Sequence, residues 1–342
     1  MLQELVSLES VSRHEDKTAA HIYNFFREKG LPAQRVLNNV WTSNRHFDPG
    51  KPSILLNSHH DTVGPNPGYT RNPFDPAIEN ERLYGLGSND AGASLVSLAA
   101  AFLYFCERDD LQCNLIFAAT AEEEISGPNG IEAILPQLPS LSCGIVGEPT
   151  GMQIAIAEKG LMVLDCEATG IAGHAARNEG DNAIYRAMKD IEWFKTYEFP
   201  EVSELLGPVK MTVTMIQAGS QHNTVPAVCR YTADIRITDR YTHDDILDTV
   251  IKHVSSIVTP RSTRIKPSSI SLHHPLVQAG IHLGYTVYGS DTTSDQALIP
   301  FPTIKMGPGD SARSHSADEY IHLSEIEKGI RDYIRLLNQV LQ

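Results

Sequence analysis

The feature that most constrains this chain is a run of apolar residues that ends in a histidine and an aspartate. Residues 54–61 read ILLNSHHD, so a hydrophobic strand leads directly to His59 and Asp61. A strand end holds an imidazole rigidly, and a carboxylate two residues on can accept its second ring N–H and fix the tautomer. His60 points the opposite way on an extended backbone, so we expect it to be structural. The pair alone is weak evidence, because a chain with 14 histidines and 42 acidic residues contains such pairs by chance.

Acidic residues follow further apolar or glycine-rich segments. Asp90 lies in GLGSNDAG, Glu123 and Glu124 lie in ATAEEEISG, and Glu148 lies in GIVGEPT. The ordinary explanations are a helix N-cap for Asp90 and a solvated loop for the glutamates of ATAEEEISG, whereas a purely structural Glu148 would be unusual after so apolar a segment. Three adjacent glutamates after a buried strand repel one another, however, and a cation would relieve that repulsion. A neighbouring carboxylate that binds no metal would then have its pKa raised and could serve as a general base.

A late histidine adds a further metal-ligand type. His315 lies in SARSHSADEY, a polar segment in which a lone histidine is usually an exposed residue. Imidazole and carboxylate ligands suit Zn²⁺, Co²⁺ or Mn²⁺, and the lack of cysteine among them fits a catalytic rather than a structural site. Each assignment is weak alone. Together they predict a site for two divalent metal ions that share one carboxylate.

Strand-like and helical segments alternate through residues 1–155. A helix is expected over 16–30 and another over 91–107, with strands at SILLNS, NLIFAAT and CGIVGEP and a short helix near Ile131. This alternation predicts a mostly parallel sheet with helices on both faces. The chemically interesting residues come just after the strands. Sites in open α/β sheets form at the carboxyl ends of strands, so one shared crevice is expected.

The pattern changes near residue 156. Strands and helices are then expected in the order strand, helix, strand, strand, helix, at 161–170, 182–197, 209–220, 229–239 and 244–257. This order predicts a small α+β unit, residues 156–265, inserted into a larger domain made of 1–155 and 266–342. The returning part of the larger domain should contain a helix over 275–284, the strand FPTIKMGPG and a helix over 324–342.

Composition argues against several classes of partner. The formal net charge is −14 and no Lys/Arg-rich run is present, so neither nucleic acid nor an anionic membrane is an expected partner. The longest apolar run, residues 95–105, is too short to span a bilayer, and the N-terminus lacks a signal-peptide pattern. The five scattered cysteines form no CxxC pair and fit reduced thiols. A cytoplasmic protein is predicted.

Five motifs resemble those of a known enzyme family. In their order and spacing, SHHDTV, GLGSNDAG, AEEEISG, VGEPT and HSADEY are similar to the co-catalytic zinc aminoacylase and carboxypeptidase family, closest to its acetylornithine deacetylase and succinyl-diaminopimelate desuccinylase members. The resemblance covers nearly the whole chain. It implies a zinc-peptidase-like α/β catalytic domain with an inserted ferredoxin-like lid that often dimerises. It also implies two divalent metal ions per chain, zinc in the first place, with cobalt as an alternative.

The resemblance implies a metal ligand at each matching motif. His59 and Glu148 would hold one metal, and Glu124 and His315 would hold the other. Asp90 would bridge both. Many relatives have Met-Lys after this aspartate, whereas this chain has Ala-Gly, which puts the detail of the turn in doubt but not the ligand.

Catalytic and substrate-binding roles come from the same resemblance. Asp61 would orient the first histidine, and Glu123 would be the general acid/base. In the lid, His174 would reach an active site, commonly that of the partner subunit, while Asn223 and Arg236 would contact the substrate carboxylate. His174 equally matches an ordinary surface residue at a strand end, and Arg236 an ordinary exposed strand residue. A glutamate replaces the usual aspartate before the Glu pair, which leaves open a shift of the base by one position.

The implied reaction is hydrolysis of the amide bond of a small N-acyl amino acid. The first prediction is conversion of N-acetyl-L-ornithine to L-ornithine and acetate, a step of arginine biosynthesis. The alternatives are N-succinyl-ornithine or acetyl-citrulline deacylation, succinyl-diaminopimelate desuccinylation, and a broader aminoacylase or dipeptidase activity. A catalytically silent binding protein is the non-enzymatic alternative, and the intact ligand and base positions weigh against it. Residues 285–296 and 311–313 are candidates for choosing the substrate, and Asp291 or Asp295 would suit a cationic side chain.

Overall fold

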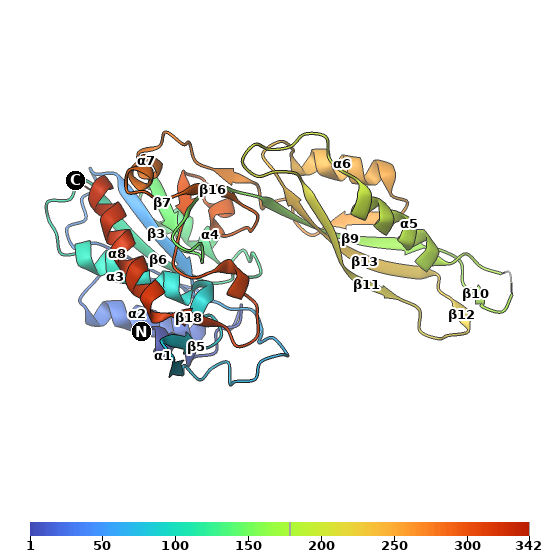
Figure 1. The fold of residues 1–342 in the computed structure, drawn as a ribbon, viewed down its shortest axis with the longest axis horizontal. Helices are drawn as coiled ribbons and strands as arrows, with labels where there is room; N and C mark the ends of the chain where they lie inside the picture. The colour runs from blue at the N-terminus through green and yellow to red at the C-terminus, as the bar shows by residue number, and fades with distance from the viewer. Residues whose placement is uncertain (178, 342) are drawn as a thin grey trace. The chain divides into compact units, whose positions relative to one another are not determined.

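The computed structural model describes residues 1–177 and 179–341, which divide into two compact units (Figure 1). Unit 1 comprises Met1–Ile156, Ser269–Tyr288 and Ser294–Gln342, and unit 2 comprises Ala157–Ser268 and Gly289–Thr293. The sequence predicts the insertion at 156–265. In the structure the short segment Gly289–Thr293 also belongs to unit 2, and the chain completes unit 1 after it.

Unit 1 is built on a mixed sheet whose central strands are parallel. In sheet order its strands are β1 (Gln34–Val36), β2 (Asn39–Ser43), β6 (Asn114–Thr120), β3 (Ser53–His59), β7 (Cys143–Val146), β17 (Thr303–Lys305), β8 (Ile154–Glu158) and β15 (Ser268–Ser269), with β16 (Val287–Ser290) paired to β8. Strand β3 runs parallel to both β6 and β7, and β17 runs parallel to β7. Antiparallel pairs flank this centre. The carboxyl ends of β3, β6 and β7 therefore meet at one edge.

Alternate residues of the central strands face two different helical layers. Ile54 and Leu56 of β3 pack in a core with the helices α2 (Asp16–Glu28), α3 (Ala93–Phe105), α7 (Pro275–His282) and α8 (Leu323–Val340). Leu55 faces the other way and packs with residues of α4 (Ile131–Ile134). A strand exposes successive side chains on opposite faces, so a fully apolar run requires cover on both sides. The expected α/β fold with helices on both faces is confirmed.

Short elements complete unit 1 around the strand ends. They are α1 (Leu2–Val6), β4 (Ile78–Glu79), β5 (Arg82–Tyr84), β18 (Tyr320–His322), a π-helical turn at Ser88–Gly92 and single 3₁₀ turns at Leu135–Gln137, Asp295–Leu298 and Ser311–Arg313. Strand β18 pairs with β5, which in turn pairs with β4. This small sheet brings the segment that contains His315 close to the turn that contains Asp90.

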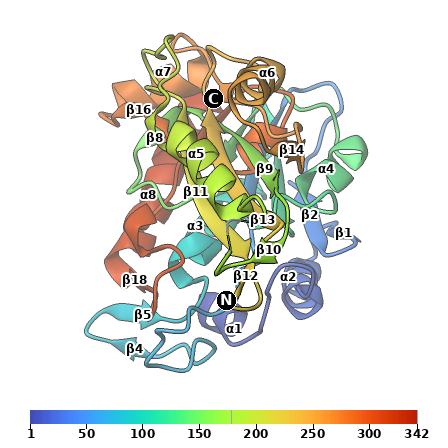
Figure 2. The same cartoon turned by 90° about the vertical axis from the view of Figure 1, so that its right-hand side faces the viewer.

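Unit 2 is an α+β unit with strand order β11-β13-β9-β14. Its main elements in chain order are β9 (Gly160–Thr169), α5 (Ala183–Thr196), β11 (Lys210–Ala218), β13 (Val228–Ile237), α6 (His243–His253) and β14 (Ile257–Pro260). All neighbouring strands are antiparallel. This order is that of the expected ferredoxin-like lid. Figure 2 shows α5 in front of β11 and β13, and the two helices share a core with β9 and β13.

One helix boundary in unit 2 was predicted incorrectly. The helix expected over 244–257 ends at His253, and β14 begins at Ile257. Asp190 of α5 accepts the backbone N–H groups of Ser255 and Ser256, at 3.1 and 2.9 Å. This capture of two backbone donors by a distant carboxylate favours a turn where the local sequence alone favours helix.

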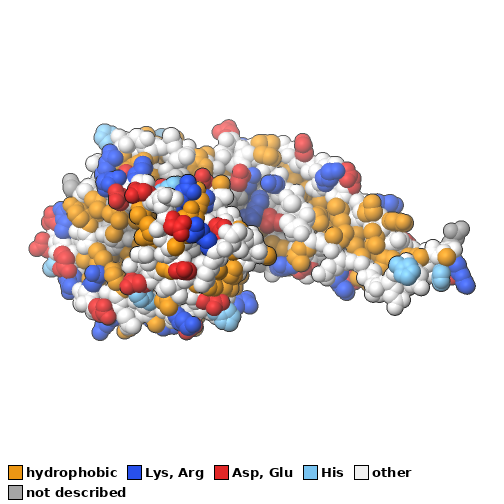
Figure 3. Space-filling view, turned by 60° about the horizontal axis from the view of Figure 1, so that its bottom comes forward, with side chains coloured by type: hydrophobic (Ala, Val, Ile, Leu, Met, Phe, Trp, Pro, Cys, Tyr) orange, Lys and Arg blue, Asp and Glu red, His pale blue; other side chains and the backbone are white. Residues whose placement is uncertain are grey.

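The pair β10 (Gly173–His174) and β12 (Thr224–Val225) forms a separate two-stranded ladder in unit 2. Acidic and basic side chains are interspersed over the surface that Figure 3 presents. Among the described residues, no helix combines the length and the apolar character that crossing a membrane requires.

Candidate metal centre

His59 ends β3 with one ring nitrogen already bound. Its Nδ1 lies 3.0 Å from the backbone carbonyl oxygen of Asp61 and 3.5 Å from the Asp61 carboxylate. Nδ1–H therefore donates to oxygen, which leaves the lone pair of Nε2 available for a metal. His60 faces away, with Nδ1 2.8 Å from Oγ1 of Thr18 and Nε2 2.8 Å from the carbonyl oxygen of Asn38. His60 is structural, as its position in the strand predicted.

Carboxylates from three other segments surround Nε2 of His59. It lies 3.2 Å from Oδ1 of Asp90, 3.8 Å from Oε1 of Glu148 and 3.9 Å from Oε2 of Glu123. Ligand atoms of His59, Asp90 and Glu124 all lie within 4.8 Å of one another, and so do those of His59, Glu123 and Glu148. One imidazole among hard oxygen donors is a donor set that suits a divalent metal ion. The structure thus brings together residues that the sequence separates widely.

His315 approaches the same group from the segment before β18. Its Nε2 lies 3.0 Å from Oε2 of Glu124 and 3.8 Å from Oδ2 of Asp90. Asp90 therefore faces His59 with one carboxylate oxygen and His315 with the other. A carboxylate that bridges two metal ions needs this arrangement.

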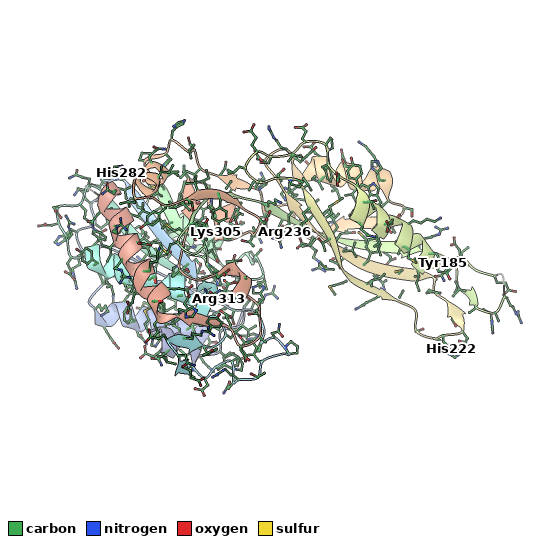
Figure 4. The ribbon with its side chains drawn as sticks, in the orientation of Figure 1. Tyr185, His222, Arg236, His282, Lys305 and Arg313 are labelled. Atoms are coloured by element: carbon green, nitrogen blue, oxygen red, sulfur yellow. The ribbon has the colours of Figure 1, made fainter. Side chains whose placement is uncertain are left out.

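Arg313 fixes the segment that carries His315. Its Nη1 and Nη2 donate to the two carboxylate oxygens of Glu325 on α8, at 2.8 and 2.6 Å, and Nη1 also donates to the carbonyl oxygen of Tyr320 at 3.2 Å. Figure 4 labels Arg313 beside this helix. The segment 311–313 was considered for substrate selection, but its arginine holds the loop to α8.

Burial and mutual repulsion change the acidity of the clustered groups. Burial, together with the charges of Asp90 and Glu124, raises the pKa of Glu148 to about 8. Burial, together with Glu148 and Glu124, raises the pKa of Glu123 well above its ordinary value. Burial opposes a charged imidazole, but Glu148 and other carboxylates hold the pKa of His59 well above its usual range. Two divalent cations would neutralise this concentration of negative charge, so the residues fit the metals that the sequence predicts.

The carboxylate of Asp61 holds the turn that carries Glu123 and Glu124. Its Oδ1 accepts the backbone N–H of Glu123 at 3.1 Å, and its Oδ2 accepts that of Glu124 at 3.2 Å. Ser12 Oγ donates to the same Oδ2 at 2.7 Å. Burial works against the charge of Asp61, but the hydrogen bond from His59 keeps its pKa lowered. Asp61 therefore joins the histidine strand to the glutamate turn, whereas the sequence analysis assigned it only to the histidine.

Glu122 is turned away from the cluster. Its carboxylate accepts Nδ2–H of Asn129 at 2.9 Å and the backbone N–H of the same residue at 3.3 Å. Glu122 has a φ of 54°, and a Cβ added at Gly127 would overlap with its side chain. The local turn therefore directs Glu122 to Asn129 and leaves Glu123 and Glu124 at the cluster.

Glu319 holds the turn that carries Asp90, a contact that the sequence analysis missed. Its carboxylate oxygens accept the backbone N–H groups of Gly87, Asn89 and Asp90, at 3.1, 2.8 and 2.9 Å. The side chain is buried, and burial raises the pKa of Glu319 to about 7. It comes four residues after His315, so it ties the segment of one candidate ligand to the turn of another.

We expect Glu319→Ala to weaken metal binding by about 10- to 100-fold, the usual cost of removing a partner that orients a ligand. The change leaves three backbone N–H groups without their acceptor and frees the turn of Asp90. Competition with a chromophoric chelator measures the affinity. Asp318→Ala is the control, because it removes the neighbouring half-buried carboxylate that binds Thr70 and Arg71. Equal affinity in the Glu319 variant and the wild type would contradict this role.

Two acidic residues considered for a cationic substrate side chain are bound elsewhere. Asp295 is only 2% exposed and accepts hydrogen bonds from Asn57 and Thr120. Asp291 is exposed but pairs with Nζ of Lys159 at 2.8 Å in unit 2. A substrate amine would have to displace these partners.

His174 and Asn223 lie in unit 2, on and beside the β10–β12 ladder. Nδ1 of His174 accepts the backbone N–H of Ala176 at 3.1 Å, which places a ring proton on Nε2, where no described residue accepts it. The carbonyl oxygen of Asn223 accepts the N–H of Ala175 at 3.0 Å. Figure 4 labels His222, the neighbour of Asn223. Their relation to the metal cluster of unit 1 stays a prediction.

Arg236 lies on β13 and is held by neighbours in unit 2 (Figure 4). Its Nε and Nη2 donate to the carboxylate of Asp234 at 2.8 and 3.1 Å, and its Nη1 donates to Oγ1 of Thr293 at 3.2 Å. The guanidinium is therefore oriented rather than free. Its contact with a substrate carboxylate stays a prediction.

Comparison with known proteins connects this cluster to a family. Residues 55–339 match the model of peptidase family M20/M25/M40. The chain belongs to this family. The resemblance found in the five sequence motifs is thereby confirmed, and the chain is a metallohydrolase that acts on amide bonds. The silent binding protein is not supported.

Two curated relatives match nearly the whole chain. Succinyl-diaminopimelate desuccinylase 2 of a Ruegeria species is 28% identical over 374 residues, which cover 98% of this chain and 92% of the relative. A LysW-lysine/LysW-ornithine hydrolase of Saccharolobus islandicus is 25% identical over 355 residues, which cover 100% of this chain and 95% of the relative.

Solved structures share the fold at low sequence identity. An M20 family metallo-carboxypeptidase from Sulfolobus solfataricus superposes with a TM-score of 0.79 at 17% identity, over 99% of this chain and 98% of the other. A dinuclear metal binding peptidase of the M20 family from Bacillus subtilis superposes with a TM-score of 0.67 at 15% identity, over 100% of this chain and 96% of the other. These likenesses confirm the metallopeptidase fold.

Proposed function

We propose that this enzyme removes the acyl group from the α-amino group of amino acids with a second amino group, with N-acetyl-L-ornithine as the first candidate. The observation that carries the proposal is the cluster of buried His59 and four partly buried carboxylates in an M20 hydrolase. The relatives are named for diaminopimelate, lysine and ornithine, which all carry a second amino group. One relative is named for a succinyl group, so N-succinyl-ornithine and succinyl-diaminopimelate are the alternatives.

Two divalent ions, zinc first and cobalt as the alternative, would be held by five side chains of unit 1. His59 and Glu148 would hold one ion, Glu124 and His315 would hold the other, and Asp90 would contact both. The distances from Asp90 to the two histidines support this division. The likeness to a peptidase described as dinuclear supports the number of ions.

The chain's own residues would manage the protons of the reaction. When bound, the two ions supply Lewis-acid stabilisation of developing negative charge and lower the pKa of a water molecule. Glu123 takes the proton from the attacking water at its carboxylate and passes it to the leaving α-amine. Asp61 keeps Glu123 in place through the backbone N–H bond described above.

Unit 2 would supply the remaining contacts. We assign His174 as a donor to the carbonyl oxygen, because the bond accepted at Nδ1 places a ring proton on Nε2. Asn223 and Arg236 would bind the substrate carboxylate.

A homodimer through unit 2 is also proposed, since β11 is an edge strand and exposes Met215 and Ile216. Figure 3 shows hydrophobic side chains gathered on unit 2, and sedimentation velocity would test the dimer.

The test of the substrate is an activity panel on the zinc- or cobalt-loaded enzyme. We expect release of a free α-amine from N-acetyl-L-ornithine, with N-succinyl-L-ornithine, succinyl-diaminopimelate, acetyl-citrulline and simple dipeptides slower. N-acetyl-L-norvaline is the matched control, because it keeps the three-carbon side chain of ornithine without the second amine. A site that binds this amine should reject norvaline by orders of magnitude. Equal turnover of both compounds would contradict the diamino specificity, and a faster succinyl substrate would change the acyl assignment.

A place in arginine biosynthesis and a cytoplasmic location stay predictions. The first depends on the outcome of the panel. Fractionation of cells that produce the protein would test the second.

A further inference from the structure

Asp295 has a buried carboxylate that is not a candidate metal ligand. It joins two of the strands that lead to the metal-ligand cluster. Asp295 begins the short 3₁₀ helix Asp295–Leu298, and its side chain is 2% exposed. Its Oδ2 accepts Nδ2–H of Asn57 at 2.8 Å and Oγ1–H of Thr120 at 2.6 Å. Both donors are fully buried. The two contacts span 238 and 175 residues of sequence, so they join parts of the chain that only the fold brings together.

The two donors of Asp295 flank His59. Asn57 precedes His59 by two residues on β3, so both side chains point to the same face of the sheet. Thr120 is the register partner of His59 on β6 and is the last residue of that strand. The backbone N–H of His60 donates to the carbonyl oxygen of Thr120 at 2.9 Å. Glu123 comes three residues after Thr120, beyond the end of the ladder.

We propose that Asp295 is a positioning residue, whose two hydrogen bonds lock the ends of β3 and β6 together and so fix the distance between His59 and Glu123. The inference rests on the proposed roles of these two residues. The ladder between β3 and β6 ends at His59 and Thr120. The two bonds of Asp295 reinforce this end of the ladder, beside the backbone bond from His60 to Thr120. A displacement of about 1 Å in a catalytic group is enough to cost roughly 100-fold in rate.

The test compares two matched pairs of variants in the full chain loaded with Co²⁺. Asp295→Ala removes both bonds, whereas Asp295→Asn keeps an oxygen that can accept them. Thr120→Val removes one bond at nearly constant volume, whereas Thr120→Ser keeps the hydroxyl. Each variant is measured for kcat, for KM and for the visible absorption spectrum of bound Co²⁺, which reports the geometry around the metal.

We expect Asp295→Ala and Thr120→Val to lower kcat by about 10- to 100-fold, as loss of an orienting partner commonly does, with KM little changed. Their Co²⁺ spectra should differ from that of the wild type. Asp295→Asn and Thr120→Ser should keep most of the kcat and the wild-type spectrum. If Asp295→Ala does not fold, the Thr120 pair decides.

Asp190 provides the matched control for the loss of a buried carboxylate. It is 4% exposed in unit 2, where its Oδ2 accepts Oγ–H of Ser256 at 2.6 Å. Asp190→Asn should lower the Tm without changing the Co²⁺ spectrum.

The inference is overturned if Asp295→Ala and Thr120→Val keep the wild-type kcat and spectrum, or if Asp295→Asn is as impaired as Asp295→Ala. A different result would show that the proposed function is wrong: the wild-type enzyme would hydrolyse no compound of the panel. The spectrum needs no substrate, so it separates the two failures.

Discussion

The Glu123→Gln variant should bind metal as the wild type does and hydrolyse its substrate slower by orders of magnitude. Glutamine keeps the size of the side chain but cannot accept the proton of the attacking water. General acid/base catalysis contributes about 10²- to 10⁴-fold, so a fall in kcat of this size is expected. Burial, with the charges of Glu148 and Glu124, raises the pKa of Glu123 well above its ordinary value, which makes its carboxylate a stronger base. Initial rates and elemental analysis of metal content measure the two effects.

The neighbouring glutamate offers a matched control for this variant. Glu122 is directed to Asn129 rather than to the cluster. Glu122→Gln should therefore keep a kcat near that of the wild type. An almost fully active Glu123→Gln would rule out the assigned base, and loss of turnover only in the Glu122 variant would move that role by one position.

Removal of metal by a chelator should abolish hydrolysis and make the stability of the protein depend on pH. Burial and neighbouring charges raise the pKa of Glu148 from the ordinary 4.5 to about 8. A raised pKa means that the folded state favours the protonated carboxyl, so this contribution to stability is complete below the ordinary pKa. It is lost as the pH rises through about 8. The Tm of the chelated protein should therefore fall between mildly acidic and mildly alkaline pH.

Added Zn²⁺ or Co²⁺ should restore activity and reduce this loss of Tm. A cation pairs with the ionised carboxylates and binds the folded state alone, so it stabilises that state by mass action. Differential scanning fluorimetry at several pH values, with and without metal, measures the effect. Chelator saturated beforehand with the same metal is the control. Full activity in protein shown to contain no metal would contradict the metal-dependent reaction.

The sequence predicted the members of the cluster because their backbone positions are regular. His59 and Glu148 come at or just beyond the ends of neighbouring parallel strands, and such ends meet at one edge of a sheet. The glutamate turn after β6 obeys the same rule. The residues alone offered His315 as a candidate ligand, and the family resemblance assigned it to one metal and gave the division of roles.

The supporting carboxylates could not be predicted in the same way. Glu319 acts on backbone N–H groups of a turn about 230 residues earlier, a distance at which pattern and periodicity carry no information. The second contact of Asp61, with the glutamate turn, is likewise between backbone and side chain. The sequence offered Asp295 as a partner for a cationic substrate side chain, because its burial depends on packing that local composition does not specify. The incorrect helix end near His253 has the same origin, in the contacts of Asp190.

The order of the cluster along the chain has a consequence for biosynthesis. The first candidate ligand along the chain is His59 and the last is His315. The turn that carries Asp90 is held by Glu319, which comes later still. During translation, the early acidic segments leave the ribosome long before the final imidazole and the clamp on that turn exist. A nascent chain halted before residue 315 should therefore hold cations weakly, and maturation with metal should be a late event that only an almost finished polypeptide can undergo.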